Sequence, residues 1–399
     1  VVMLSLGASF AQDDSNQNIA EVSMDGSDDA VVAVDANAIG NFTELQNVIN
    51  SGSTTINLDK DYQYGGSADI NKISVTRTGI TINGNGHTIN CLSNDGNHAS
   101  LFAASVSGYT FTLTLKNISI SNSQDYDNPS ILYGTNPSLD VEVTLKNVNI
   151  SNCRGNIAIT GHRVWIYDSY FNNNTFDNSM FFLTSAMIYN SVFMNNNGNV
   201  SILNVPNKYD SPGYYQRQIH NNIFINNGDT LFNGTSALII NVTENYWGSN
   251  TITTFNYTTI ANSYLLYING TDIFSEDDDK NYSVGFINDG TPAVDSLPYL
   301  DYVFSLDPAI GTISPSNMVL TVNENQITVH PTSAGNTTIK LAAKQSLNTT
   351  LLSKDIEITQ GLKKYNLTIS ATNVTYGNYV TINVNLKDAD GNGVAGNVT

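Results

Sequence analysis

The sequence is poor in charged residues, and above all in cations. Asp, Glu, Lys and Arg make up 13% of its 399 residues, about half of the share that is usual in globular domains. Only 16 residues are Lys or Arg, against 35 that are Asp or Glu, so the formal net charge is −19. A chain with this charge repels polyanions, which argues against nucleic acid and anionic membrane surfaces as partners. An acidic polysaccharide would need local cations or bound calcium, and the cations are scarce.

Cysteine is also rare, and the familiar catalytic signatures are missing. Cys91 and Cys153 are the two cysteines. A chain of this length can bury a large core without disulfides, so we expect two buried thiols, with a bridge between them as the alternative. The sequence contains no GxSxG elbow, no HExxH helix and no CxxC pair. The usual marks of a serine hydrolase, a zinc protease and a dithiol oxidoreductase are therefore lacking.

Long apolar runs are missing as well. No stretch reaches the roughly eighteen apolar residues that a membrane-spanning helix needs. Residues 1–11 are apolar and end in a Ser-x-Ala step, which indicates the last part of a signal peptide cleaved after Ala11. Residues 12–36 are acidic and polar and are predicted to be a disordered leader. We therefore expect an extracellular protein at the cell surface, and its many Asn-x-Ser/Thr sequons allow glycosylation.

What the sequence has in abundance is a repeat of short β-type segments. Clear copies are LKNISISN, LKNVNISN, IYDSYFNN and IYNSVFMN. The key positions follow one another at steps of 30, 21, 22, 31 and 24 residues and are Asn117, Asn147, Asp168, Asn190, Asn221 and Asn245. Because each unit carries alternating apolar residues and no helix, the repeat predicts a parallel β-helix, which is an all-β fold.

The asparagines of the repeat have a structural explanation. In a parallel β-helix each rung pairs with the rungs above and below it, about 4.8 Å away. Ile118 and Ile120 of one copy would point inward and stack on Val148 and Ile150 of the next. Asn tolerates the left-handed backbone conformation of a bend, and stacked Asn side chains can hydrogen-bond along the axis. We therefore interpret the Asn and Asp positions as a structural ladder.

Two steps of the repeat, 30 and 31 residues long, exceed the others. The excess lies at residues 124–140 and 204–218. Both stretches precede the same strand of the repeat, so we expect them to leave the solenoid at one corner and to form a binding face. Ordinary loop decoration is the alternative. The candidate ligand-binding residues are tyrosines, whose rings suit contact with carbohydrate or protein: Tyr126, Tyr133, Tyr209, Tyr214 and Tyr215.

Other elements flank the repeat. Asn41 followed by Glu44 matches a capping box, so a short helix is predicted to cover the open end of a β-helix at residues 37–255. Beyond Trp247 the pattern changes, and two strand-like segments recur about one hundred residues later. This recurrence predicts one complete Ig-like β-sandwich module, of typical length for that fold, and the start of a second. The predicted bounds of the two modules are 262–361 and 362–399.

These features resemble one family. Ile80–Ile89, the Asn-rich rungs and the motif Asn245-Tyr246-Trp247-Gly248 are similar to segments of the large adhesin-like surface proteins of archaea. In those proteins a pectate-lyase-like, right-handed parallel β-helix precedes tandem bacterial-Ig-like modules. The resemblance covers about residues 40–399. It implies a cell-surface protein that contacts host or microbial cells through glycans or surface proteins.

A polysaccharide lyase or glycoside hydrolase on the same scaffold is the runner-up hypothesis. Arg163–Ser169 is similar to a lyase segment that reads Val-Trp-Ile-Asp-His, but Tyr167 interrupts it and Ser169 replaces the His. Asp168 already belongs to the ladder. The remaining carboxylates do not form the paired arrangements of β-helix hydrolases. We therefore expect no catalytic residues, and a structural stalk without a ligand is the third hypothesis.

Neither a cofactor nor a metal site is expected. Asp388–Gly393 matches the start of a calcium loop, but the twelfth position is Thr399 in place of Glu, so a hairpin turn explains the segment. Glu276–Lys280 is an acidic cluster, which we interpret as a solvated loop. Weak calcium binding is the alternative at these places.

Overall fold

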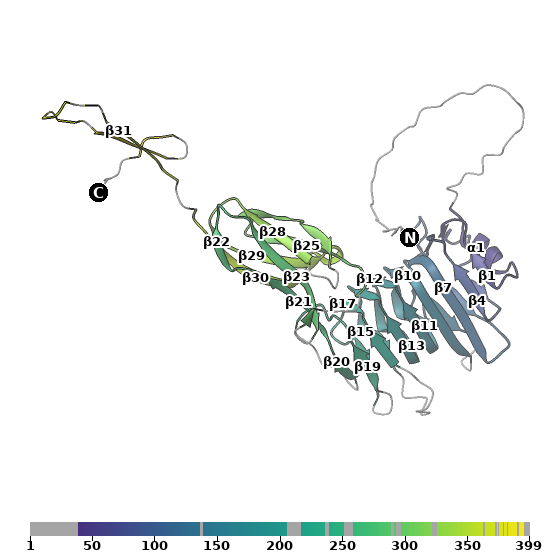
Figure 1. Cartoon of the computed structure of the whole chain (residues 1–399). Coiled ribbons are helices and arrows are strands. Elements are labelled where there is room, and N and C mark those ends of the chain that lie inside the picture. Colours follow the sequence, from purple (N-terminus) through teal and green to yellow (C-terminus); the bar gives the residue numbers. More distant parts are fainter. Residues whose placement is uncertain are drawn as a thin grey trace, which may run out of the picture. The chain divides into compact units, whose positions relative to one another are not determined.

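The structure is a computed structural model, and it describes residues 39–135, 139–205, 217–235, 239–250, 258–288, 291–292, 297–320, 325–361, 364–371, 373, 375–377, 379–380, 382–388 and 391–394. The signal segment expected at residues 1–11 and the leader expected at 12–36 lie outside this part of the chain. Strands make up most of the described residues, and the largest group of them pairs in parallel (Figure 1). The predicted all-β class is therefore confirmed.

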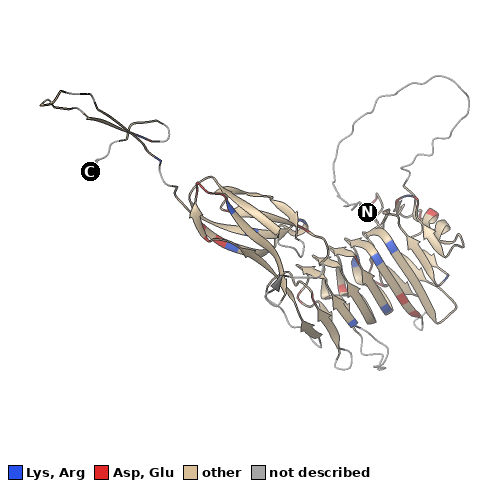
Figure 2. Ribbon diagram, viewed as in Figure 1, with Lys and Arg blue, Asp and Glu red and all other residues tan. Residues whose placement is uncertain are grey.

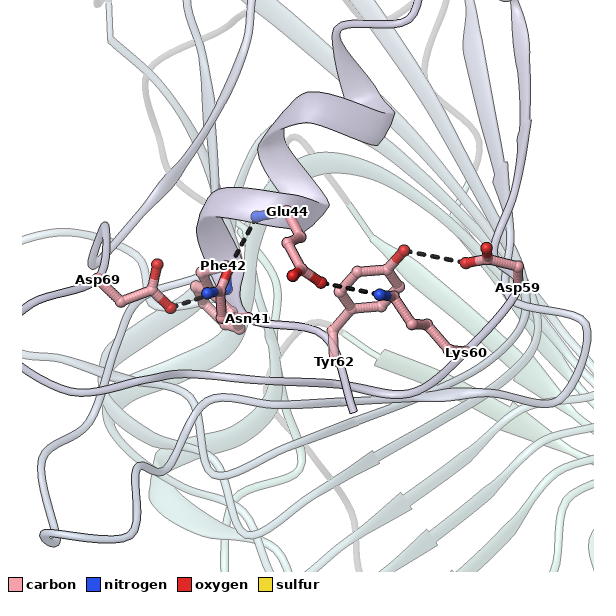
Figure 3. A network of polar contacts seen from close by, with 7 residues as sticks. All are labelled: Asn41, Phe42, Glu44, Asp59, Lys60, Tyr62 and Asp69. Atoms are coloured by element: carbon pink, nitrogen blue, oxygen red, sulfur yellow. Dashed lines mark hydrogen bonds and ion pairs between the residues drawn. The ribbon is translucent and has the colours of Figure 1, made fainter. Parts of the chain in front are cut away.

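The first element is a short helix, α1 (Phe42–Ile49). Its N-cap is Asn41, whose Oδ1 accepts a hydrogen bond from Glu44 N at 2.8 Å (Figure 3). In place of the second hydrogen bond of a capping box, the Glu44 carboxylate pairs with Lys60 Nζ at 2.8 Å. The helix start therefore depends on the N-cap side chain and on contacts from outside the helix.

Asp69 ties the helix to a neighbouring loop (Figure 3). Its carboxylate accepts hydrogen bonds from Phe42 N, Thr43 N, Thr43 Oγ1 and Gly65 N at 2.6 to 2.9 Å. Burial raises the pKa of Asp69, but these hydrogen bonds outweigh it and hold the pKa below its ordinary value. Phe42 and Leu45 are buried in the same apolar core as the first rungs.

Strands β1 to β20 pair in parallel and form three faces of a β-helix. The first face consists of β1 (Thr55–Asn57), β4 (Ile80–Asn83), β7 (Thr110–Ser121), β10 (Asp140–Ser151), β11 (Arg154–Tyr167), β13 (Thr175–Tyr189), β16 (Arg217–His220), β19 (Ile240–Thr243) and β20 (Thr258–Ala261). The expected end at residue 255 lies outside the described residues, and the parallel pairing is present again in β20.

The other two faces use shorter strands and the ends of the long ones. The second face consists of β2 (Tyr62–Gln63), β5 (Thr88–Asn90), the second halves of β7 and β10, β12 (Tyr170–Asn172), β14 (Val192–Met194) and β17 (Ile223–Ile225). The third face consists of β3 (Ile73–Val75), β6 (Phe102–Ala104), β8 (Gln124–Asp125), β9 (Leu132–Gly134), the first halves of β11 and β13, β15 (Asn197–Asn204) and β18 (Phe232–Asn233).

Inward side chains stack in columns along the axis. Phe171, Phe193, Phe224 and Trp247 form one such column, with ring centroids 4.6, 5.3 and 5.1 Å apart. Offset stacking of this kind adds about 0.5–1.5 kcal/mol per pair to the burial of apolar area. The alternation of the sequence thus places one apolar residue of each copy above that of the copy before.

The bends carry left-handed residues, as the repeat suggests. Those at the bends of the first face from β7 to β16 have φ between 50° and 56° and are Asn117, Asn147, Asp168, Asn190 and Asn221. Asn147 Nδ2 donates to Asn117 Oδ1 at 3.0 Å, and Asn190 Nδ2 donates to Asp168 Oδ1 at 2.6 Å. In the last copy the left-handed residue is Glu244, with φ of 57°. The bend position that we assigned to Asn245 is therefore wrong by one residue.

A second, inner column of polar side chains accompanies the outer one. At each bend from β12 to β17 the residue after the left-handed Asn or Asp points into the interior, and those with carboxamide or hydroxyl side chains are Ser169, Asn174, Ser191, Asn196, Asn222 and Asn227. Asn245 belongs to this column, because its Oδ1 accepts from Asn222 N at 2.9 Å. These side chains satisfy backbone groups that the bends leave outside the strand ladders.

Two five-stranded sheets follow the solenoid. The first consists of β21 (Tyr264–Asn269), β23 (Lys280–Asn288), β24 (Thr291–Pro292), β26 (Gly311–Ser314) and β28 (Asn325–Pro331). The second consists of β22 (Ile273–Ser275), β25 (Asp301–Asp307), β27 (Asn317–Val319), β29 (Gly335–Ala343) and β30 (Thr350–Thr359), with the 3₁₀ turn η1 (Lys344–Ser346). Their buried side chains share one apolar cluster. Assignment of these sheets to the Ig-like class stays a prediction.

The last strands form a separate two-stranded sheet. β31 (Asn366–Ala371) pairs antiparallel with β32 (Ile382–Lys387). The predicted second module at 362–399 is represented by this hairpin among the described residues.

Candidate functional site

The five predicted tyrosines do not form one described surface. Tyr126 is exposed, at 55% of its full area. Tyr133 is engaged by Lys72, whose Nζ donates to the Tyr133 hydroxyl at 2.8 Å and lies 5.0 Å from the ring centroid. Tyr209, Tyr214 and Tyr215 lie outside the described residues. Of the five candidates, Tyr126 therefore has an exposed ring, and Tyr133 has a ring that is held in contact with Lys72.

The first of the two longer stretches does not leave the solenoid as we expected. β8 pairs with the start of β11, and β9 pairs with β6 and β11, so both belong to the third face. Ser130 and Ile131 are fully buried, and their backbone N atoms each donate to the next rung at 2.9 Å. The extra residues complete a wall of the β-helix, which is why the prediction of a protruding insertion is wrong there. Residues 206–216 of the second stretch lie outside the described part.

The outer surface of the first face carries an aromatic column that the sequence analysis missed. Tyr167, Tyr189 and His220 are register partners on β11, β13 and β16. Their rings are stacked, with centroids 5.7 and 5.5 Å apart and interplanar angles of 7° and 6°. A signal was present, because these residues occupy the same position in the copies IYDS, IYNS and IHNN. Trp165 lies two residues before Tyr167 in the same half-buried, outward series.

Polar contacts fix this aromatic column. The Tyr189 hydroxyl donates to Gln218 Oε1 at 2.8 Å, and His220 Nδ1 makes a hydrogen bond with Thr243 Oγ1. Burial lowers the pKa of His220, although the nearby Glu244 acts in the opposite direction. The imidazole is therefore neutral at pH 7. Since the rings stack on one another along the axis, they present edges and polar atoms to solvent.

Basic side chains lie against the acidic ones at the start of this face. Asp140 Oδ1 lies 2.7 Å from His162 Nδ1, and Glu142 Oε1 lies 3.2 Å from Arg163 Nη1. A carboxylate beside an imidazole has the composition of a general base, so this cluster is the part of the solenoid closest to a catalytic set. Asp168 accepts the hydrogen bond from Asn190 described above, so it has a structural role in the bend.

The acidic loop at Glu276–Lys280 also has internal partners. Asp279 Oδ2 lies 2.9 Å from His330 Nδ1, and Glu276 Oε1 accepts from Gly361 N at 3.1 Å. Within the described ranges, three or more His, Cys, Asp or Glu side chains do not gather as a metal site would require. Part of the turn at Asp388–Gly393 lies outside those ranges.

Both cysteines are buried and unpaired. The alternative of a bridge between Cys91 and Cys153 is therefore not realised. Burial raises the pKa of both thiols, that of Cys153 to about 12. They are apolar core residues and not nucleophiles.

Comparison with known proteins gives one family match. Residues 38–158 match the family model described as "Putative pectate lyase-like adhesive domain". The matched segment contains α1 and the rungs from β1 into β11. No curated protein and no solved structure matches the chain. Within the described residues, none of the helices has the length and apolar character of a membrane span. The first part of this β-helix is thus similar to a domain described as adhesive.

Proposed function

We propose that the protein is an adhesin-like protein of the extracellular cell surface, and that its β-helix contacts glycans or surface proteins of other cells. The observation that carries this proposal is the match of residues 38–158 to a pectate lyase-like adhesive domain. The two sheets that follow the solenoid would act as an Ig-like spacer. Secretion through a signal peptide and glycosylation of exposed sequons are parts of the same proposal.

The partners of the acidic and histidine side chains favour an adhesive function over a catalytic one. Asp168 accepts a hydrogen bond within the bend column, His98 Nδ1 lies 2.8 Å from the carbonyl oxygen of Asn122, and His87 pairs with Asp61 at 3.1 Å. Each of these groups connects neighbouring parts of the solenoid wall. Fixed partners of this kind account for the positions of these side chains without a substrate.

The test is a pair of assays on the full chain. Incubation with pectin and mannan, with and without calcium, measures the release of unsaturated or reducing ends. A glycan array measures binding without cleavage. We expect binding and no release. Release of ends that is lost in Glu142→Gln would overturn the proposal in favour of a polysaccharide-degrading enzyme, since Glu142 lies in the cluster with Asp140 and His162.

A further inference from the structure

Two lysines lie on neighbouring rungs without a carboxylate partner. Lys116 of β7 and Lys146 of β10 are register partners on the first face, and Figure 2 shows two blue segments side by side on these strands. Neither lysine takes part in an ion pair within the described residues. Rungs are about 4.8 Å apart, and like charges directly opposite each other destabilise a sheet. The pair therefore opposes folding and calls for an explanation outside the fold.

Composition does not force this arrangement. Acidic residues outnumber cationic ones by 35 to 16, so a cation readily finds an acid. Most other cations of the β-helix do have partners: Lys60 pairs with Glu44, Lys72 donates to a tyrosine hydroxyl, and Arg77 donates to two backbone carbonyl oxygens. The two aligned lysines differ from these cations, because neither has an ion-pair partner among the described residues and they lie next to each other on neighbouring rungs.

The surroundings of the lysines suit a polar, negatively charged ligand. Lys146 is the register partner of Tyr167, so the column continues through the stacked rings to His220. Asn83 precedes Lys116 in the same column. Three carboxylates of the described residues lie on this part of the face, and each has a partner: Asp168, which follows Tyr167, accepts from Asn190 Nδ2, Glu142 pairs with Arg163, and Asp140 lies beside His162. More distant acidic residues are screened beyond about 8 Å at physiological salt, so the net charge of −19 does not by itself exclude an anionic ligand at the two lysines.

We propose that this column binds a linear anionic polysaccharide that lies along the solenoid axis. The rung spacing of about 4.8 Å is comparable with the length of one sugar residue, so successive acidic groups would meet Lys116 and Lys146. The edges and hydroxyls of Tyr167 and Tyr189 would then hydrogen-bond the neighbouring sugars. This inference rests on the proposed adhesive function and narrows its ligand to one chemical class. It also revises the expectation that cations are too scarce for an acidic glycan.

The test uses the full chain immobilised on a biosensor at low salt. Polygalacturonate and dextran sulfate are the carboxylate and sulfate probes, dextran is the neutral probe, and single-stranded DNA is a polyanion of another class. We expect one or both acidic polysaccharides to bind, and the affinity to fall as salt rises. Replacing both lysines by Gln should weaken binding about tenfold or more, as expected for the loss of charged hydrogen-bond donors. The melting temperature should stay the same or rise.

Arg154→Gln is the matched control. Arg154 is an exposed cation at the start of β11, on the third face, so this variant removes elsewhere one positive charge, the same as either single lysine replacement. It should change affinity less than about twofold. Equal loss in this variant, or equal binding of DNA, would overturn the proposal in favour of a general charge effect. Binding of neutral dextran that persists in the lysine variants would overturn the proposed anionic ligand but would leave the adhesive function standing. Failure of both acidic polysaccharides to bind would also overturn the proposed ligand.

Discussion

Replacing Asn196 by Ala removes four hydrogen bonds from the interior of the β-helix. Asn196 is 1% exposed. Its Oδ1 accepts from Asn174 N at 3.2 Å and from Asn174 Nδ2 at 2.9 Å, and its Nδ2 donates to Phe171 O and to Asn227 Oδ1, both at 3.0 Å. Two of the four groups keep another partner, because Asn174 Nδ2 also donates to Ile150 O and Asn227 Oδ1 also accepts from Asn196 N.

Phe171 O lies in β12, which stays paired with β14, so Asn174 N is the group that loses the hydrogen bond that the Asn196 side chain supplied. A buried polar group left without a partner costs about 1–3 kcal/mol. The expected decrease in the free energy of unfolding is therefore about 1–3 kcal/mol. This is a large fraction of the stability of an ordinary domain.

Urea unfolding followed by tryptophan fluorescence measures this decrease. Trp165 and Trp247 are the two tryptophans, and both lie in the rungs, so the signal reports on the β-helix alone. Asn199→Ala is the control, because Asn199 is exposed on β15, and it should change stability by less than about 0.5 kcal/mol. If Asn196→Ala costs no more than this control, the inner column does not stabilise the solenoid.

Three further predictions follow from particular residues. Gly155→Ala should prevent folding or cost about 3 kcal/mol or more in the free energy of unfolding, because φ is 135° and a Cβ would lie 1.9 Å from a backbone carbonyl oxygen of the rung before. Gly86→Ala is the control, since φ is 90° but no atom of the described residues lies near the added Cβ. Thermal unfolding should show a cost of only about 1 kcal/mol for this control. A thiol reagent should modify neither cysteine in the native protein and both in urea; native reaction would contradict their burial. The lowered pKa of Asp69 means that its stabilising effect is present above the unfolded-state value near 3.8 and is lost as the pH falls below it, so Asp69→Asn should lower the melting temperature at pH 7 and flatten its decline in acid.

The outer column could be predicted from the sequence, whereas the inner column could not. A left-handed bend selects Asn or Asp by backbone sterics alone, so the residue type at one position reveals the conformation. The inner side chain is selected by the partners it meets on neighbouring rungs. Ser191 and Asn196 satisfy such requirements with different side chains, and Cys153 holds the equivalent place in an earlier rung. In the copy that contains β19, Glu244 takes the left-handed position, although the residue type favours its neighbour Asn245 there.

The binding face was harder to predict. The number of residues between two copies of the repeat does not show whether the extra residues form a protruding loop or additional strands of the β-helix. Residues 124–134 hold two strand segments that pair with other rungs. Parallel pairing is a long-range property that a single repeat copy does not carry. By contrast, the column of Tyr167, Tyr189 and His220 could have been found by comparing equal positions between copies. Core packing does not restrict the residue type at an exposed or half-buried position of a repeat. At this position of the first face, the successive copies carry lysines and then aromatic rings.

The same comparison of copies indicates where the solenoid meets its neighbour. On the second face, the outward position occupied by Asn149 in β10 is occupied by Tyr170, Val192 and Ile223 in the following rungs. A solvated face should stay polar along the axis, so the change from Asn to Val and Ile predicts a covering domain. Val192 and Ile223 are indeed buried in one apolar cluster with side chains of the two sheets that follow. A binding surface built on the outward positions must therefore lie where these positions stay polar, and the column of Lys116, Lys146, Tyr167, Tyr189 and His220 on the first face meets this condition.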